Sequence, residues 1–417
     1  MINISETLKA LSNRRMGVML MLGFSSGLPL ALSGGTLQAW LATTTIDIKT
    51  IGIFSLVGLP YTLKFLWAPI MDRFVPPFFG RRRGWILLTQ GLLFGLILAM
   101  ASSHPEDAIF MVGFIAVAVA FCSASQDIAI DAYRADVLKP EERGFGSALS
   151  VAGYRIAMLV SGSLALVFAD YLGWQLTYYI MGGLILIGMA TTIFGPELTW
   201  QVEAPKSLQD AIVEPFKEFM SRPNFLWILV LIILYKLGDA FAGTLTTTFL
   251  LRGLEFSLTE VGVVNKGMGL FASIAGGLVG GGLMFKYGLY RCLLWFGILQ
   301  ALTNLGFMIL ALMAKNYIGM VIVIAMEQIA GGMGTATFVA LLITLCDHRF
   351  TATQFALFSA LSAVGRVFIG PPAGLLVDSL GWTSFFLITF VVALPGLALL
   401  IYLRKSIESY HSILNSE

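Results

Sequence analysis

Charged residues are scarce in this chain, since Asp, Glu, Lys and Arg make up only 12% of its 417 residues. An ordinary soluble domain carries about 25%. Hydrophobic residues reach 57%, so too few polar side chains are present to cover several soluble cores. This composition excludes a soluble enzyme, a nucleic-acid-binding protein and a disordered chain, and it leaves an integral membrane protein. The net charge of +2 indicates no particular partner.

Cysteine and histidine are also rare. The three cysteines are scattered through apolar stretches, at Cys122, Cys292 and Cys346. They are predicted to be small packing residues without a disulfide framework. The three histidines lie in loops or in the tail, at His104, His348 and His411. Without a metal cluster or a nucleophile beside a base, they argue against a membrane-bound enzyme such as an acyltransferase. We expect neither a metal nor a cofactor.

The alternation of apolar and polar residues that marks a membrane β-strand is absent too. The chain has long apolar runs instead, as in 86–101, 109–124 and 385–403. A helix of roughly 20 apolar residues crosses the hydrocarbon layer, and it satisfies its own backbone hydrogen bonds. The sequence therefore predicts an all-α, polytopic membrane protein.

Twelve transmembrane helices are predicted, and most connections between them are short. They cover 16–41, 50–72, 85–102, 107–133, 145–169, 174–194, 224–250, 258–285, 291–313, 317–345, 353–377 and 382–403. The longest connection, 195–223, is rich in charge and proline. It is predicted to link an N-terminal half, 1–194, to a C-terminal half, 224–417. Its middle, 208–220, is compatible with an amphipathic helix on the membrane surface.

Basic residues set the expected orientation. One set of loops, with the two termini, carries 18 Lys and Arg residues, and the opposite loops carry three. Because cytoplasmic loops are enriched in these residues, both termini are expected in the cytoplasm. The polar first 15 residues run into a long span without a cleavage site, so no cleaved signal peptide is expected.

Motifs recur about half a chain apart. Phe168–Trp174 resembles Leu376–Trp382, and Gly35–Leu37 recurs as Gly243–Leu245, in both cases 208 residues later. The sequence SALS, followed by a glycine and an arginine, starts at Ser147 and again at Ser359. Three repeats in order predict two parallel six-helix halves. This organisation is similar to that of the major facilitator superfamily, whose halves rock around a central site.

A charged loop motif supports this resemblance. Asp72 and Arg73 precede a stretched segment and then Gly80 with three arginines, 81–83. This order is similar to the superfamily's G-x-x-x-D-R-x-G-R-R motif. Asp72 and Arg73 are therefore predicted to hold a cytoplasmic gate. The alternative is simple anchoring of the loop by its arginines.

Nine charged residues are expected inside the predicted spans. They are Lys64, Asp127, Asp131, Arg155, Lys236, Asp239, Lys266, Glu327 and Arg366. Each costs at least about 2.5–3.5 kcal/mol at mid-membrane. We therefore expect them to be paired or to face water, and to serve transport.

Asp127 and Asp131 are one helical turn apart and share a face. Two neighbouring carboxylates repel each other, so one of them gains proton affinity in a dry cleft. They are predicted to couple transport to protons, with Lys64 and Arg155 as counter-ions that also bind substrate and Gln126 as a neighbouring substrate contact. The alternative is a structural ion-pair network, in which Asp131 is the more natural member.

The C-terminal half offers a second set. Lys236 and Asp239, at i and i+3, either form an intrahelical salt bridge or give Asp239 a proton-coupling role beside substrate-binding Lys236. Arg366, the repeat partner of Arg155, suits a substrate carboxylate because its guanidinium binds carboxylate through two bonds.

Two further polar residues are candidate contacts for a hydroxyl-rich substrate. Gln38 lies in the first predicted span, and Thr244 lies in the seventh. Thr244 has the alternative of bonding to its own helix. Glu327 and Lys266 receive no role.

Several runs resemble the AmpG-type muropeptide permeases. The matching runs include Gly23–Leu30, Gly58–Pro69, Gln126–Tyr133, Gly153–Arg155 and Tyr235–Asp239. The resemblance extends along most of the chain. Some members of that family are longer and carry extra spans.

The resemblance implies proton-driven import of anhydro-muropeptides into the cytoplasm for cell-wall recycling. The implied substrate is N-acetylglucosaminyl-1,6-anhydro-N-acetylmuramic acid with or without its peptide. The implied protein is a monomer of the bacterial inner membrane, linked to β-lactamase induction where that circuit exists. Two alternatives stay open: a proton-coupled carrier of another organic anion, such as an acetyl-CoA-like or peptide solute, and a membrane sensor that transports nothing.

Overall fold

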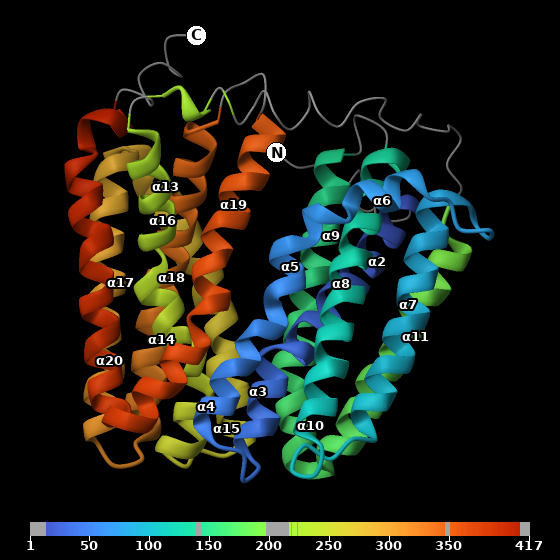
Figure 1. The fold of residues 1–417 in the computed structure, drawn as a ribbon, viewed down its shortest axis with the longest axis horizontal. Coiled ribbons are helices and arrows are strands. Elements are labelled where there is room, and N and C mark those ends of the chain that lie inside the picture. Colours follow the sequence, from blue (N-terminus) through green and yellow to red (C-terminus); the bar gives the residue numbers. More distant parts are fainter. Residues whose placement is uncertain are drawn as a thin grey trace, which may run out of the picture. The chain divides into compact units, whose positions relative to one another are not determined.

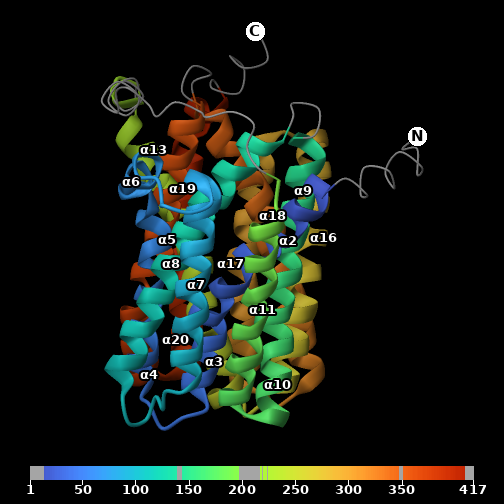
Figure 2. The same ribbon diagram turned by 90° about the vertical axis from the view of Figure 1, so that its right-hand side faces the viewer.

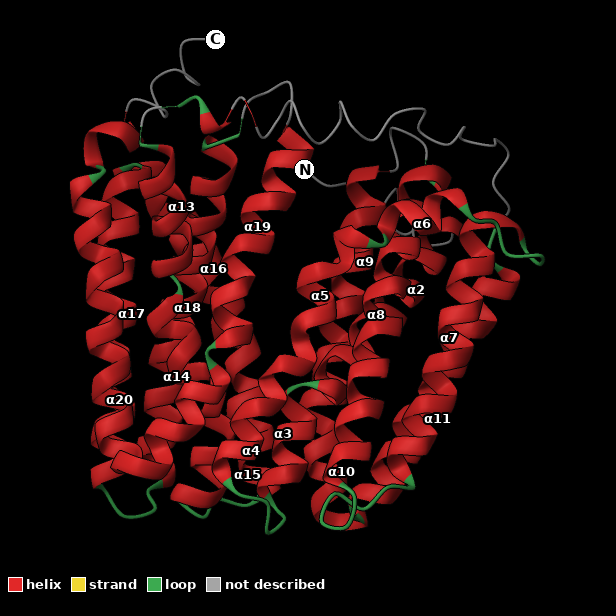
Figure 3. Ribbon diagram, viewed as in Figure 1, coloured by secondary structure: helices red, strands yellow, loops and turns green. Residues whose placement is uncertain are grey.

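The computed structural model describes residues 14–138, 143–196, 217, 219–222, 224–346 and 351–408. Regular structure within these ranges is helical, and no strand occurs there (Figure 3). The longer helices are α2 (Arg14–Ser33), α3 (Gly35–Ala42), α7 (Gly80–Ala101), α8 (Ile109–Val137), α9 (Arg143–Met158), α10 (Ala165–Leu172), α11 (Trp174–Phe194), α13 (Phe225–Leu234), α14 (Leu237–Thr248), α16 (Gly269–Tyr287), α17 (Leu289–Leu312), α18 (Tyr317–Thr344), α19 (Thr351–Phe368) and α20 (Gly370–Tyr402).

Ten helical stretches in the described part are long and apolar enough to cross a membrane. Their last stretch, Leu357–Tyr402, contains the final two predicted spans. It is interrupted at Gly381, where φ is 75°. Glycine tolerates this left-handed backbone because it has no Cβ. The prediction of a multi-pass helical protein is confirmed, and the count of twelve spans stays a prediction.

The prediction of one helix over 50–72 is wrong. This stretch consists of α4 (Ile48–Ile53), a 3-10 helix (Phe54–Gly58), α5 (Leu59–Leu63), a second 3-10 helix (Lys64–Leu66) and α6 (Ala68–Arg73). Proline lies in the first turn of α5 and again of α6. A proline lacks the N–H that would continue a preceding helix, so each one begins a new segment.

The chain forms two compact units. Unit 1 holds the described residues of 14–46, 57–196 and 257–263, and unit 2 holds those of 47–56, 224–256 and 264–408. Each predicted half therefore lends one short segment to the other unit. The predicted linker, 195–223, and the amphipathic helix expected within it lie mainly outside the described residues, so that boundary stays a prediction.

Glycines on facing helices bring α2 and α9 into backbone contact in unit 1 (Figure 1). A Cβ added at Gly23 would collide with the backbone of Ser150, and one at Gly27 with the backbone of Tyr154. From the other side, a Cβ at Gly153 would collide with the backbone oxygen of Leu20. We call this contact the α2–α9 seam.

The remaining helices of unit 1 pack around this seam. In two perpendicular views, α7 lies between α8 and α11 (Figures 1 and 2). Buried apolar side chains join α2, α7 and α8, including Leu22, Ile86, Ile130 and Tyr133. The carboxylate-bearing end of α8 is therefore held against α2 by apolar packing.

Unit 2 has a comparable contact between a different pair of helices, α16 and α18. A Cβ at Gly276 or Gly280 would collide with the backbone of Ile329 or Met333. One at Gly332 would collide with the backbone oxygen of Ser273. We call this contact the α16–α18 seam. An apolar core joins α18 to α13, α17, α19 and α20.

The two exchanged segments are each tied to an aspartate of the repeated motif. In unit 1, the backbone N–H and the hydroxyl of Thr259, in α15 (Leu258–Val261), donate to the Asp170 carboxylate, the hydroxyl at 2.5 Å. In unit 2, Lys49 of α4 forms an ion pair with Asp378 at 2.8 Å. The repeat thus places one aspartate at the equivalent contact of each unit.

Candidate functional site

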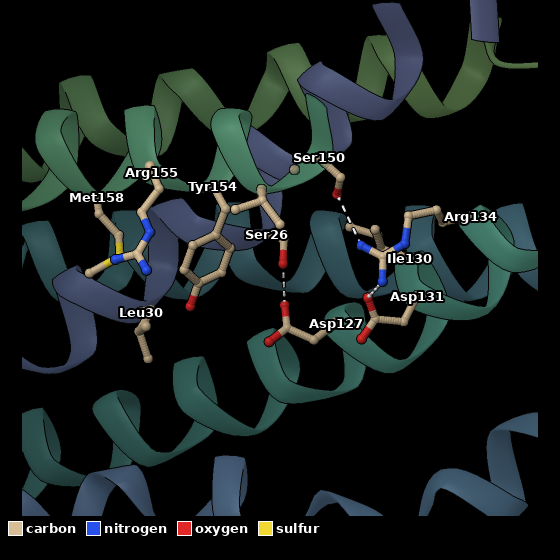
Figure 4. Close-up of a pocket in the computed structure, with 12 residues that line it drawn as sticks. Ser26, Leu30, Asp127, Ile130, Asp131, Arg134, Ser150, Tyr154, Arg155 and Met158 are labelled. Atoms are coloured by element: carbon tan, nitrogen blue, oxygen red, sulfur yellow. Dashed lines mark hydrogen bonds and ion pairs between the residues drawn. The ribbon is translucent and has the colours of Figure 1, made fainter. Parts of the chain in front are cut away.

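A cavity of about 380 Å³ lies among α2, α8 and α9 of unit 1 (Figure 4). Its polar lining comprises Ser26, Asp127, Asp131, Arg134, Ser150, Tyr154 and Arg155. All belong to one unit, and the two aspartates come from adjacent turns of the continuous helix α8. The structure therefore brings Asp127, Asp131 and Arg155, three of the predicted site residues, to one cavity.

Asp127 has one direct hydrogen-bond partner among the described residues. The hydroxyl of Ser26 on α2 donates to the Asp127 carboxylate at 2.5 Å. Ser26 lies between Gly23 and Gly27, so the α2–α9 seam fixes the helix that carries this donor. Asp127 forms no ion pair with any cation in the described part of the chain.

Asp131 is held differently. Its carboxylate forms an ion pair with Arg134 at 2.9 Å, and Arg134 also donates to the Ser150 hydroxyl at 3.3 Å. The Asp131 side chain is 56% exposed. An exposed pair of this kind contributes only about 0.2–1 kcal/mol. Asp131 is thus a paired, open-facing carboxylate, and its predicted proton-coupling role stays a prediction.

The two predicted counter-ions do not contact Asp127. Lys64 lies in the second 3-10 helix, near enough for its charge to act on Asp127 but without an ion pair. Arg155 on α9 lines the cavity and is exposed, with no ion pair to a described residue. Arg155 is therefore available to a ligand in the cavity, whereas Lys64 is not part of the cavity lining.

The two predicted glutamine contacts lie elsewhere. Gln126 is fully buried, and its amide donates to the backbone oxygen of Ser25 at 2.9 Å. Its own carbonyl oxygen has no partner. Gln126 therefore ties α8 to α2 and does not line the cavity. Gln38 lies half-buried on α3, outside the cavity lining.

A second polar cluster lies in unit 2, where the seventh predicted span is broken. Helix α13 ends before Tyr235, and α14 begins after Lys236. The Lys236 ammonium donates to the Asp239 carboxylate at 3.1 Å and to the Gln300 amide oxygen at 2.9 Å. Asp239 lies in the first turn of α14, where helix amides favour negative charge. The ammonium of Lys236 and the N-terminus of α14 therefore both favour a negative charge at Asp239.

The other predicted contacts are dispersed. The Thr244 hydroxyl donates to the backbone oxygen of Ala240 at 2.7 Å, as its alternative assignment expected. Arg366 is exposed on α19 and forms no ion pair with a described residue. The side chains of Asp72 and Arg73 lie outside the described part of the chain, so the gate stays a prediction.

Three contact residues were not predicted: Ser26, Arg134 and Gln300. Ser26 and Gln300 contact their partners across helix pairs, at sequence separations of 101 and 64 residues. Spacing along the chain cannot predict such contacts between helices. A glutamine within an apolar run does indicate that a polar partner lies nearby. Arg134 is three residues after Asp131, and that spacing indicated the pair. No group of side chains able to hold a metal ion occurs among the described residues.

Sequence comparison places this geometry in a known context. The family model described as Major Facilitator Superfamily matches residues 16–369. The anhydromuropeptide permease of Escherichia coli strain K12 is 53% identical over 405 residues, which cover 97% of this chain and 82% of the relative.

Solved structures of low sequence identity share the fold. A POT family transporter in complex with a thioalcohol-conjugated peptide has a TM-score of 0.74 at 14% identity, covering 94% of this chain and 96% of that chain. A D-xylose–proton symporter has a TM-score of 0.69 at 12% identity, covering 93% and 96%. At these identities the similarity supports the fold alone.

Proposed function

Because this chain belongs to the major facilitator superfamily, we propose that it is a secondary active transporter that imports anhydro-muropeptides by proton symport. The proposed substrate is N-acetylglucosaminyl-1,6-anhydro-N-acetylmuramic acid, with or without peptide. Import would run from periplasm to cytoplasm by alternating access and would serve cell-wall recycling. The similarity to the E. coli permease over nearly the whole chain supports this substrate class.

The main support for the proposal is the cavity of unit 1, which is lined by Asp127, a carboxylate that forms no ion pair with a described residue. Asp127 accepts one hydrogen bond from a neutral hydroxyl and meets no cation directly. A carboxylate in this setting, away from bulk water, exchanges a proton more readily than one locked in an ion pair. We therefore assign proton coupling in unit 1 to Asp127 and a structural role to Asp131.

Substrate recognition would use the uncommitted cations. Arg155 lines the same cavity, and its planar guanidinium suits a carboxylate such as the lactyl group of a muramic acid. Arg366, its repeat partner in unit 2, offers a second guanidinium. The positive charge of Lys64 acts on Asp127. A substrate anion that binds Lys64 would reduce this effect, so substrate binding and proton binding at Asp127 would influence each other.

The same proposal covers the setting of the protein. It would lie in the bacterial inner membrane as a monomer, with both termini in the cytoplasm and two six-helix halves joined by 195–223. The excess of basic residues on one set of loops supports this orientation. Asp72 and Arg73 would hold the cytoplasmic gate.

The test is a substrate panel in proteoliposomes with an imposed pH gradient. The panel comprises the anhydro-disaccharide, its peptide-bearing form, a free peptide and a CoA thioester. We expect gradient-dependent uptake of the first two only. Uptake of the thioester or the free peptide instead would replace the substrate class, and no uptake of any solute would favour a sensor.

A substitution in the cavity tests whether Arg155 binds the substrate, and a control substitution outside the spans tests for a general loss of folded protein. Arg155→Ala is expected to weaken uptake of the lactyl-bearing disaccharide by about tenfold, because the guanidinium–carboxylate bond is charge-assisted. The matched control is Arg404→Ala, which removes a guanidinium paired with Glu408 outside the spans. An unchanged apparent affinity in Arg155→Ala would remove this residue from the binding site.

A further inference from the structure

Glu327 is a carboxylate of unit 2 that the mechanism above does not use. It lies on α18 in a candidate membrane span and is half-buried. In the described part of the chain it forms neither a hydrogen bond nor an ion pair. A carboxylate at such a depth is costly unless it is neutralised by a partner or by a proton.

Charged groups approach Glu327 from two other elements. The charges of Lys236 and Asp239, at the break between α13 and α14, act on it, and so does the charge of Lys266. Lys266 lies in a π-helical segment (Gly262–Met268) directly before α16. It also lacks a direct partner among the described residues. Segments of π-helix occur frequently at functional sites.

The α16–α18 seam holds these groups at a constant spacing. Near its start, a Cβ at Gly269 would lie 3.2 Å from the side chain of Gln328, the residue after Glu327. Further along, Gly276 meets the backbone of Ile329 and Gly332 meets that of Ser273. Backbone contact along this line holds α18, which carries Glu327, directly against α16, which follows the segment of Lys266.

The two acids of unit 2 therefore differ in the same way as those of unit 1. Asp239 is ion-paired with Lys236 and lies at a helix N-terminus, so its ionised form is stabilised. Glu327 has no direct cation among the described residues, although the charges of Lys236, Lys266 and Asp239 all act on it. Its ionised form receives less stabilisation than that of Asp239.

We propose that Glu327, and not Asp239, is the reversible proton-binding group of unit 2, with Lys266 and Lys236 as the cations that neutralise it after proton release. A proton from water converts the carboxylate to the neutral acid, and the same proton later returns to water. This role rests on the proposed function for its part in transport. Proton binding by Glu327 does not depend on which solute is carried.

The first measurement needs no substrate. Infrared spectroscopy of the purified protein in nanodiscs reads the C=O band of a protonated carboxyl group as the pH is raised. We expect the titrating band of the parent to lose the Glu327 contribution in Glu327→Gln, while the Asp127 contribution remains, and to keep its full amplitude in the matched control, Glu408→Gln. Glu408 is paired with Arg404 outside the spans. A band of the same amplitude in Glu327→Gln would overturn the proposal.

The second measurement tests whether proton binding by Glu327 is coupled to transport. Proteoliposomes report gradient-driven accumulation of the anhydro-disaccharide, and counterflow without a gradient. We expect Glu327→Gln to lose gradient-driven accumulation by about tenfold or more, within the range typical of coupling between two sites, and to keep counterflow within about twofold of the parent. Retained counterflow also shows that the variant is folded.

The remaining outcomes are equally informative. Accumulation equal to the parent, or loss of counterflow together with accumulation, would overturn a coupling role for Glu327. If counterflow is lost because the protein is unstable, Glu327→Asp decides, since the shorter acid should restore the infrared band and part of the accumulation. A parent that takes up no muropeptide would refute the proposed function while the infrared result still stands.

Discussion

Unit 1 and unit 2 use glycine to join different pairs of helices, although both derive from one repeated sequence pattern. In unit 1 the backbone contact joins α2 and α9, which correspond to the first and fifth predicted spans. In unit 2 it joins α16 and α18, which correspond to the eighth and tenth. The repeat therefore preserves the helices without preserving their closest contacts.

The side chains at equivalent positions explain this difference. At the offset of 208 residues, Leu231 and Tyr235 stand where unit 1 has Gly23 and Gly27. Gly365 is the repeat counterpart of Gly153, and the atom nearest to a Cβ there would be a side-chain carbon of Leu237 at 3.3 Å, with the backbone no closer than 3.9 Å. Larger residues on one helix thus keep the pair apart even where the partner retains its glycine.

The ionisable groups of the two units are arranged alike, although they lie on different helices. Of the four acids predicted inside the spans, one in each unit is held in an ion pair, Asp131 with Arg134 or Asp239 with Lys236. The other acid of each unit has no direct cation among the described residues, Asp127 on α8 or Glu327 on α18. Asp127 lines the cavity beside the α2–α9 seam, and Glu327 lies on α18, one of the two helices of the α16–α18 seam.

The largest expected effect tests the seam of unit 1 against its repeat counterpart. Gly153→Ala should lower the free energy of unfolding by about 3 kcal/mol, because its Cβ meets backbone that cannot move away cheaply. Gly365→Ala should cost less than about 1 kcal/mol, since flexible side chains can adjust. Thermal unfolding of both purified variants measures the difference, and equal losses would refute the distinction between the seams.

The next effect separates the two acids of unit 1. Asp127→Asn should reduce gradient-driven uptake by about a hundredfold, the upper part of the range for coupling between sites, while leaving expression intact. Asp131→Asn should change uptake by less than about threefold, because it removes only an exposed pair. Gradient-driven uptake by Asp127→Asn at the parent's rate would remove the coupling assignment.

A smaller effect compares two buried glutamines that are 210 residues apart in the repeat. Gln300 accepts a hydrogen bond from the charged Lys236, whereas Gln90 of unit 1 contacts the neutral hydroxyls of Ser25 and Thr192. Hydrogen bonds to charged groups are worth more, so Gln300→Leu should cost about 2 kcal/mol and Gln90→Leu about 1 kcal/mol. Unfolding measurements that reverse this order would show that the charge of Lys236 is satisfied elsewhere.

The smallest effect concerns the two helix caps of the exchanged segments. In unit 2 the hydroxyl and the backbone N–H of Thr50 donate to the Asp47 carboxylate, which lowers its pKa below the usual range. In unit 1 the uncharged Ser257 hydroxyl caps α15, 210 residues later. Either change, Asp47→Ala or Ser257→Ala, should cost about 1 kcal/mol at pH 7.

The pH dependence then distinguishes the caps. A depressed folded-state pKa contributes stability above the ordinary carboxyl pKa of about 3.9, and that stability is lost as the pH falls through the lower folded value. The cost of Asp47→Ala should therefore shrink in acid. The cost of Ser257→Ala should stay constant, because a hydroxyl does not titrate there. Unfolding curves from pH 7 to pH 3 measure both, and parallel behaviour would show that the Asp47 charge contributes nothing.

Local spacing carried much of the site prediction. The i, i+4 separation of Asp127 and Asp131 placed both on one face of α8, and both line the cavity. The i, i+3 separation of Lys236 and Asp239 allowed their ion pair, which forms at 3.1 Å. Asp127 and Asp131 share one helix, and Lys236 caps the helix that carries Asp239. Local backbone geometry constrains residues this close in the chain, so the sequence alone is sufficient to predict such pairs.

Residue spacing along the chain did not predict the contacts between helices. Lys64 and Arg155 were predicted as counter-ions from their similar depth, yet the direct partner of Asp127 is Ser26. Equal depth does not specify how far apart two helices lie or how each is rotated. Those quantities depend on the side chains along the entire contact, including the glycines that are distant in sequence from Asp127.

The sequence by itself determined the membrane class, the repeated halves and the scarcity of charge within the spans, because hydropathy and repeated motifs are properties of short stretches. Only the tertiary structure decided which helices meet at backbone distance and which acids are left without a cation. A buried charge is stabilised by the groups that surround it in space. Which helices approach each other is settled by the packing of each whole unit.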